Sequence, residues 1–235
     1  PISLGRTDFR FRPDGTAIQP VTGVNGTFGQ TLTAFDKRFL VTTSNHALYA
    51  TPLPHHYLRR NPYVPAPAEN ANASNYNQVF PTSEPHPWRQ ARGEDPRWVK
   101  FYGAQEATPN GYFTSACGPL IYRSDLLPAR YRGNLFCCEP SQNLVHRCLV
   151  EREEGGFRVR RAAEETASEF LASTDRWHRP MNLYVDADGA LIVDVDTSGV
   201  WLTQRLSLAP TAASPRSASA DPPRLYPARR TRTGN

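Results

Sequence analysis

The chain has 235 residues, among them 22 prolines and a single methionine, and its 27 basic and 22 acidic residues give a formal net charge of +5. Residues 205–235 hold six arginines and one aspartate, which accounts for the whole excess and leaves 21 basic and 21 acidic residues elsewhere. A body without excess positive charge argues against nucleic-acid binding, and the lack of any run of about 18 apolar residues predicts that no transmembrane helix is present.

A strand–turn–strand pattern recurs along the chain. It is interrupted by a PDG turn in residues 9–21, it is clear in residues 38–53, 134–150 and 190–206, and residues 157–161 add one more hairpin edge. No long amphipathic helical period appears. Repeated hairpins are expected within the four-stranded blades of a β-propeller, because one blade cannot bury its faces alone. The sequence therefore predicts an all-β fold, and its hairpins are of the kind that propeller blades contain.

Residues 61–109 differ from the hairpin segments. Their prolines, an asparagine-rich run and the isolated Trp88 and Trp98 give no sustained period. We expect a long inter-blade loop here, and long loops on rigid scaffolds often shape binding sites. The Pro-, Ser- and Arg-rich residues 205–235 predict a disordered tail after a propeller part that covers residues 1–204.

A DG turn indicates a hairpin between residues 181–185 and 190–195, because glycine accepts the positive φ that a tight reversal needs. The DADG sequence at residues 186–189 superficially suggests a calcium loop. The turn alone explains it, since no further ligand spacing follows.

The four cysteines, Cys117, Cys137, Cys138 and Cys148, allow three full pairings. Adjacent Cys137 and Cys138 point to opposite faces of a strand, so at most one of them readily meets a given partner. We expect a disulfide between Cys117 and Cys138, which an exported protein would permit. Four buried thiols are the alternative. The absence of a CxxC motif argues against zinc and covalent haem.

Four ordered stretches also resemble a known family: residues 5–14 (GRTDFRFRPD), 42–62, 113–147 and 168–196. They are similar to planctomycete-type membrane-bound dehydrogenase proteins, which are related to the β-propellers of soluble quinoprotein glucose/sorbosone dehydrogenases. The resemblance covers residues 5 to about 195. It implies that the chain forms the C-terminal blades of a six-bladed propeller.

The resemblance further implies an exported or periplasmic oxidoreductase that oxidises a sugar or an alcohol with pyrroloquinoline quinone (PQQ) and Ca²⁺. Electrons would pass to a c-type haem domain or cytochrome, and membrane association would come from parts outside this chain. The chain has no haem motif, and the base of the related enzymes belongs to an earlier blade. We therefore expect an incomplete fragment that is inactive alone. A non-catalytic propeller that binds a glycan or a protein is the alternative, because one fold serves many functions.

The resemblance gives Arg179 as the main cofactor-binding residue, since a planar guanidinium pairs well with the carboxylates of PQQ. Asp175, shortly before Arg179 at the start of the matching strand, is a second predicted cofactor residue, and an ion pair between the two is the structural alternative. Asn45 and His46 lie in the turn of the hairpin in residues 38–53. We expect Asn45 to contact the cofactor, and His46, a candidate base by chemistry, to be a loop residue or a cofactor neighbour.

Glu139 and Asn143 lie in the CEPSQNLVH hairpin, where their oxygens are candidate calcium ligands. Both residue types also hold turns through hydrogen bonds from side chain to backbone. We expect the second role.

Overall fold

The computed structural model describes residues 8–21, 26–50, 70–196 and 201–206, together with the single residues 23, 57, 60, 61 and 63. Strands dominate these residues, every strand pairing is antiparallel, and the few helices are short. The prediction of an all-β protein is therefore confirmed. None of the sheets formed by the described residues closes on itself.

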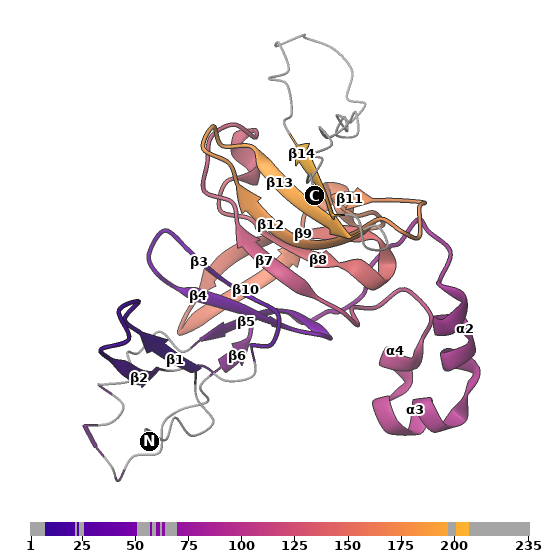
Figure 1. The fold of residues 1–235 in the computed structure, drawn as a ribbon, viewed down its shortest axis with the longest axis horizontal. Coiled ribbons are helices and arrows are strands. Elements are labelled where there is room, and N and C mark those ends of the chain that lie inside the picture. The colour runs from indigo at the N-terminus through magenta and orange to yellow at the C-terminus, as the bar shows by residue number, and fades with distance from the viewer. Residues whose placement is uncertain are drawn as a thin grey trace, which may run out of the picture.

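The strands form four sheets (Figure 1). The first pairs β1 (Asp8–Phe11) with β2 (Ile18–Val21). The β3–β6 sheet contains, in order, β3 (Gln30–Leu32), β4 (Arg38–Thr42), β5 (Asn45–Ala50) and β6 (Asn70–Asn72). The β7–β11 sheet contains β7 (Cys117–Ile121), β8 (Leu135–Glu139), β9 (Leu144–Glu153) and β10 (Gly156–Arg161), with β11 (Leu171–Ala172) paired to the start of β9. The β12–β14 sheet contains β12 (Arg179–Val185), β13 (Leu191–Asp196) and β14 (Trp201–Leu206).

Neighbouring strands in each sheet follow one another along the chain, apart from β11. The hairpins predicted within residues 9–21, 38–53, 134–150 and 190–206 are thus present as β1–β2, β4–β5, β8–β9 and β13–β14. The DG turn is also confirmed, because Gly189 has a φ of 91° and its N–H donates to the carbonyl of Asp186 across the β12–β13 connection.

The β7–β11 sheet lies between the two other large sheets and is buried on both faces (Figure 1). Strand β8 shows this clearly, because all five of its residues are buried. Its Phe136 packs in a cluster with Leu183 and Val193 of the β12–β14 sheet, whereas Leu135 packs in a cluster with Phe39 of the β3–β6 sheet. Alternation along one strand therefore supplies apolar side chains to two separate interfaces.

The first strands of the three large sheets lie side by side around Gly118 of β7. The Gly118 N–H donates to the carbonyl of Phe28 just before β3 (3.0 Å), and the Ile121 N–H donates to the hydroxyl of Thr31 in β3 (2.9 Å). On the other side, a Cβ on Gly118 would stand only 2.7 Å from the Cα of Asn182 in β12. The backbones of β7 and β12 thus approach each other where Gly118 has no side chain.

Residues 61–109 are only partly irregular. They contain β6 and three helices, α2 (Pro87–Glu94), α3 (Pro96–Tyr102) and α4 (Ala104–Ala107), which lie together beside the sheets in Figure 1. Prolines start α2 and α3, and the Asp95 side chain accepts from the Arg97 N–H at the start of α3. The expectation of a plain loop is corrected here; helices this short leave no period to detect in the sequence.

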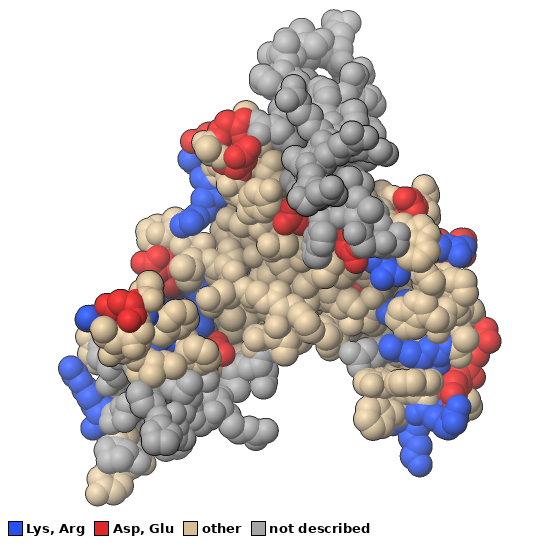
Figure 2. Space-filling view, viewed as in Figure 1, with Lys and Arg blue, Asp and Glu red and all other residues tan. Residues whose placement is uncertain are grey.

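Three 3₁₀ turns complete the described elements: η1 (Ala129–Tyr131), η2 (Pro140–Gln142) and η3 (Ala163–Glu165). No helix in the described ranges has both the length and the apolar character that crossing a bilayer requires. On the face seen in Figure 2, the basic side chains lie in separate groups near acidic ones rather than as one continuous basic surface.

All four cysteines are free, buried thiols, so the expected disulfide is not formed in the structure. Cys117 and Cys138 nevertheless stand opposite each other across β7 and β8, as the predicted pairing requires. Cys138 packs in the cluster shared with the β12–β14 sheet and Cys137 in a cluster with Val41 of β4, which confirms that these neighbours face opposite sides. Strand β14 includes the first two residues of the predicted tail, and residues 207–235 lie outside the described residues.

The close approach at Gly118 predicts that Gly118→Ala destabilises the fold more than Gly133→Ala. Both glycines have positive φ, so each alanine costs about 1–2 kcal/mol in backbone strain. Only at Gly118 would the new Cβ also clash with backbone atoms, which adds about 1–3 kcal/mol. Urea unfolding of both variants measures the difference, and equal losses would contradict the side-by-side placement of β7 and β12.

Candidate functional site

A pocket of about 210 Å³ opens where turn η2, helix α2 and the start of β12 meet. Turn η2, between β8 and β9, provides part of its lining, and the β12–β14 sheet provides Arg179 and the end of β13. The lining residues are His86, Trp88, Arg89, Pro140, Ser141, Asn143, Arg176, Arg179, Met181 and Asp196. Two sheets and a helix far apart in sequence therefore share this pocket.

Asn143 holds the pocket together. It follows η2 in the left-handed conformation, with φ 60° and ψ 42°, which asparagine tolerates better than most residues. Its side-chain amide donates to the carbonyls of Arg176 (3.0 Å) and His178 (2.8 Å), and its oxygen accepts from the hydroxyl of Ser83 (2.7 Å). Asn143 thus fixes the segment before β12 against η2, and its contacts match the predicted side-chain to backbone role.

Arg179 lines the pocket and stacks over the ring of Trp177, with 5.4 Å between the guanidinium carbon and the ring centroid. No ion pair within the described residues involves Arg179 or Arg176. The alternative ion pair with Asp175 is therefore not formed, and Asp175 instead accepts from the Trp177 N–H (2.9 Å). Of the three arginines that line the pocket, Arg176 and Arg179 have no ion pair among the described residues, and Asp196 is the carboxylate in the same lining.

The other predicted cofactor residues lie away from this pocket's lining. Asn45 accepts from the Ala47 N–H (3.0 Å), and neither Asn45 nor Asp175 lines the pocket. We expected His46 to be a loop residue. It lies instead in strand β5, with an exposed fraction of 0%. A fully enclosed imidazole cannot reach a substrate, which removes His46 as a candidate base.

The Glu139 carboxylate also binds backbone. One oxygen accepts from the N–H groups of Thr114 (3.0 Å) and Ser115 (2.8 Å), and the other, Oε1, has no hydrogen-bond partner among the described residues. Burial raises the pKa of Glu139 to about 7, although the two N–H bonds favour the charged form. The contacts of Glu139 and Asn143 are those of residues that hold loops, as we expected, and the calcium hypothesis stays a prediction from the resemblance.

Sequence analysis missed a buried chain of polar side chains between the β3–β6 and β7–β11 sheets. The Nδ1 atom of His146 lies 2.6 Å from a carboxylate oxygen of Glu169, and its Nε2 atom lies 3.0 Å from the hydroxyl oxygen of Tyr76. The other oxygen of Glu169 accepts from Arg161 (2.8 Å) and from the Phe80 N–H (2.9 Å). The signal that sequence analysis overlooked is the histidine inside the largely apolar segment NLVHRCLV.

Burial and hydrogen bonds together determine the protonation states of Glu169 and His146. Burial opposes ionisation of Glu169, but the bonds from His146 and Arg161 outweigh it and hold the pKa of Glu169 below its ordinary value. Burial lowers the pKa of His146 in spite of Glu169. A neutral imidazole that faces a carboxylate through Nδ1 must carry its proton there, because a carboxylate only accepts. Nε2 of His146 is then unprotonated, and its lone pair accepts a hydrogen bond from the hydroxyl of Tyr76.

A family model described as a domain of unknown function, DUF7133, matches residues 2–198, so the chain belongs to this family. No curated protein and no solved structure matches the chain. The matched range contains the pocket, the buried polar chain and every strand up to β13.

The raised pKa of Glu139 predicts a pH dependence that Glu139→Gln removes. A folded pKa of about 7 lies above the ordinary value of about 4.3, so the stability that the protonated acid contributes is lost as pH rises through this window. Glutamine stays neutral at every pH. The free energy of unfolding of the variant therefore rises relative to that of the natural protein by up to about 3 kcal/mol between about pH 4.5 and pH 8.

Urea unfolding at several pH values measures this gain. The matched control is Glu154→Gln, at an exposed turn position. A Glu139→Gln difference that does not change with pH, or that the control reproduces, would contradict the assignment.

Proposed function

We propose that this member of the DUF7133 family is an arc of a β-propeller of the quinoprotein glucose/sorbosone dehydrogenase kind. The observation that supports this most directly is the stack of three antiparallel meanders whose first strands, β3, β7 and β12, lie together. Propeller blades are meanders of this type arranged around a central channel. Face-to-face burial of the middle sheet fits a blade with a neighbour on each side.

The pocket lies at one rim of this arc. Antiparallel strands alternate in direction, so the turn between the second and third strands of one sheet is at the same end as the start of its first strand. Turn η2 connects the second and third strands of the β7–β11 sheet, and Arg179 starts the first strand of the next sheet. The rim where loops of neighbouring blades meet is a natural place for a ligand.

The side chains of the pocket suit PQQ, a flat aromatic molecule with carboxylate groups. Arg176 and Arg179 offer guanidinium groups that pair with carboxylates in bidentate fashion. The rings of Trp88 and Trp177 flank that of His86, with centroids 6.1 and 5.6 Å away, and provide apolar edges. When bound, PQQ supplies the oxidant for a hydroxyl group of a sugar or an alcohol. The electrons would go to a c-type haem domain or cytochrome in the periplasm, outside this chain.

Titration of the chain with PQQ, followed by the absorbance of the quinone, tests the proposal. We expect saturable binding that Arg179→Ala weakens about 10- to 100-fold, because a charge-assisted bond contributes about 1.5–3 kcal/mol. The matched control is Arg158→Ala, an exposed arginine of β10 that pairs with Glu153 away from the pocket lining. Binding that does not saturate, or that both variants weaken equally, would overturn the proposal.

The same preparation tests activity. Because His46 is enclosed, we expect no dye-linked oxidation of glucose or of a simple alcohol by this chain alone with PQQ and Ca²⁺. Measurable turnover would show that the chain contains a base of its own, and the expectation of an inactive fragment would be wrong.

Binding of a glycan without catalysis is the second candidate. Trp88 and Trp177 are about half exposed beside the pocket (48% and 49%), and exposed indole rings stack well on sugars. Failure of PQQ to bind, together with glycan binding that Trp177→Ala abolishes, would favour this function over the first.

A further inference from the structure

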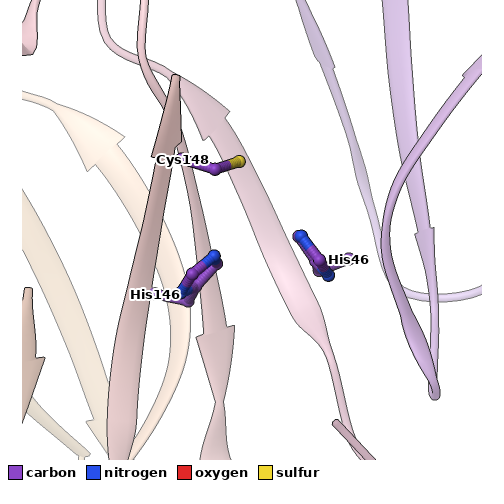
Figure 3. Close-up of side chains that lie close together, drawn as sticks. All are labelled: His46, His146 and Cys148. Atoms are coloured by element: carbon purple, nitrogen blue, oxygen red, sulfur yellow. The ribbon is translucent and has the colours of Figure 1, made fainter. Parts of the chain in front are cut away.

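Three potential metal ligands from two sheets meet in the interior. His146 and Cys148 are two residues apart on β9 and so face the same side of their sheet, and His46 comes from β5 of the sheet opposite. Their donor atoms all lie within 4.8 Å of one another, and each residue has an exposed fraction of 0%. Figure 3 shows the three side chains pointing into the same space between their strands.

Neither ring nitrogen of His46 has a hydrogen-bond partner among the described residues. The ring stacks on Phe113, with 4.5 Å between centroids and an angle of 20° between the planes, and its edge meets His146. A buried polar group without a partner costs about 1–3 kcal/mol. A ligand between His46, His146 and Cys148 would remove this penalty.

His146 is already oriented as a metal ligand would be. Its Nδ1–H is held by the Glu169 carboxylate, which leaves the lone pair of Nε2 for another group. Ligating histidines in proteins commonly have such a carboxylate behind them, because it fixes the tautomer and raises the basicity of the ligating nitrogen. Glu169 is itself fixed by Arg161 and by the Phe80 N–H, so the arrangement is rigid.

We propose that His46, His146 and the thiolate of Cys148 bind one Zn²⁺ ion that links the β3–β6 sheet to the β7–β11 sheet. Imidazole nitrogen and thiolate sulfur are the ligands that zinc prefers, at about 2.0–2.3 Å in a tetrahedron. The donor atoms now lie within 4.8 Å of one another, and in a zinc tetrahedron they would stand about 3.5 Å apart.

The hydroxyl of Tyr76 lies 3.0 Å from Nε2 of His146, the nitrogen that would bind zinc. On binding, this hydrogen bond opens and Cys148 releases its proton to water, while the bond from His146 to Glu169 stays. The site is independent of the proposed function, since none of its three ligands lines the pocket near Arg179.

Refolding of the full chain in a thiol reductant, once with a chelator and once with Zn²⁺, tests the proposal. We expect the zinc sample to hold one Zn²⁺ per chain and to have the higher Tm, because the buried donors are reached only before the sheets close. Co²⁺ used as a probe should give the intense absorption of a cobalt–thiolate bond. A natural chain whose Tm does not respond to zinc, or that binds cobalt without this absorption, would overturn the proposal.

Variants assign the ligands. Cys148→Ser and His46→Phe, which keeps the stack on Phe113, should each weaken zinc binding at least 100-fold and abolish the rise in Tm. The matched control is Cys138→Ser, an equally buried thiol on the opposite face of the same sheet, which should keep both. Retained binding in Cys148→Ser or in His46→Phe overturns the assignment, and so does loss in Cys138→Ser with the fold intact. If the ligand variants do not fold, the response of the natural chain decides.

Discussion

Burial of the β7–β11 sheet on both faces is the constraint on which the rest of this structure depends. A sheet with one wet face needs apolar side chains at every second position, whereas β7, β8 and the first half of β9 are buried at nearly every position. Strand β8 meets the demand with the sequence LFCCE, in which two large apolar residues are followed by two small thiols. Two neighbouring sheets must then cover it, and the chain provides them immediately before and after in sequence.

Dry interfaces of this kind impose strict conditions on polar groups. Arg147 and His146 are adjacent in β9 and enter opposite interfaces, and each has a carboxylate: Glu165 at 2.8 Å for Arg147, and Glu169 for His146. An unpaired charge at either place would cost several kcal/mol. His46 differs from these two residues, because neither of its ring nitrogens has a hydrogen-bond partner among the described residues, and this points to a bound ligand.

The pocket is a consequence of the same packing at its margin. Where the strands end, the faces of adjacent sheets are no longer filled by side chains from both sides, and loops determine what remains open. Asn143 is the central residue there, since one side chain binds the segment before β12 and the segment before α2 at once. The side chains of Arg176 and Arg179 have no ion-pair partner among the described residues, because the segment that carries them is held by its backbone carbonyls rather than by their charges.

The sequence by itself determined the hairpins β1–β2, β4–β5, β8–β9, β12–β13 and β13–β14, the positive φ of Gly189 and the opposite orientation of Cys137 and Cys138, because these follow from local periodicity and turn chemistry. The sequence did not predict the helices in residues 87–107, because helices this short leave no detectable period of apolar residues. Only the tertiary structure decided that Arg179 meets Asn143 in one pocket, that Asn45 does not, and that His46 lies against His146 and Cys148. These meetings join segments up to about a hundred residues apart, and burial between sheets, rather than any local preference, brings them together.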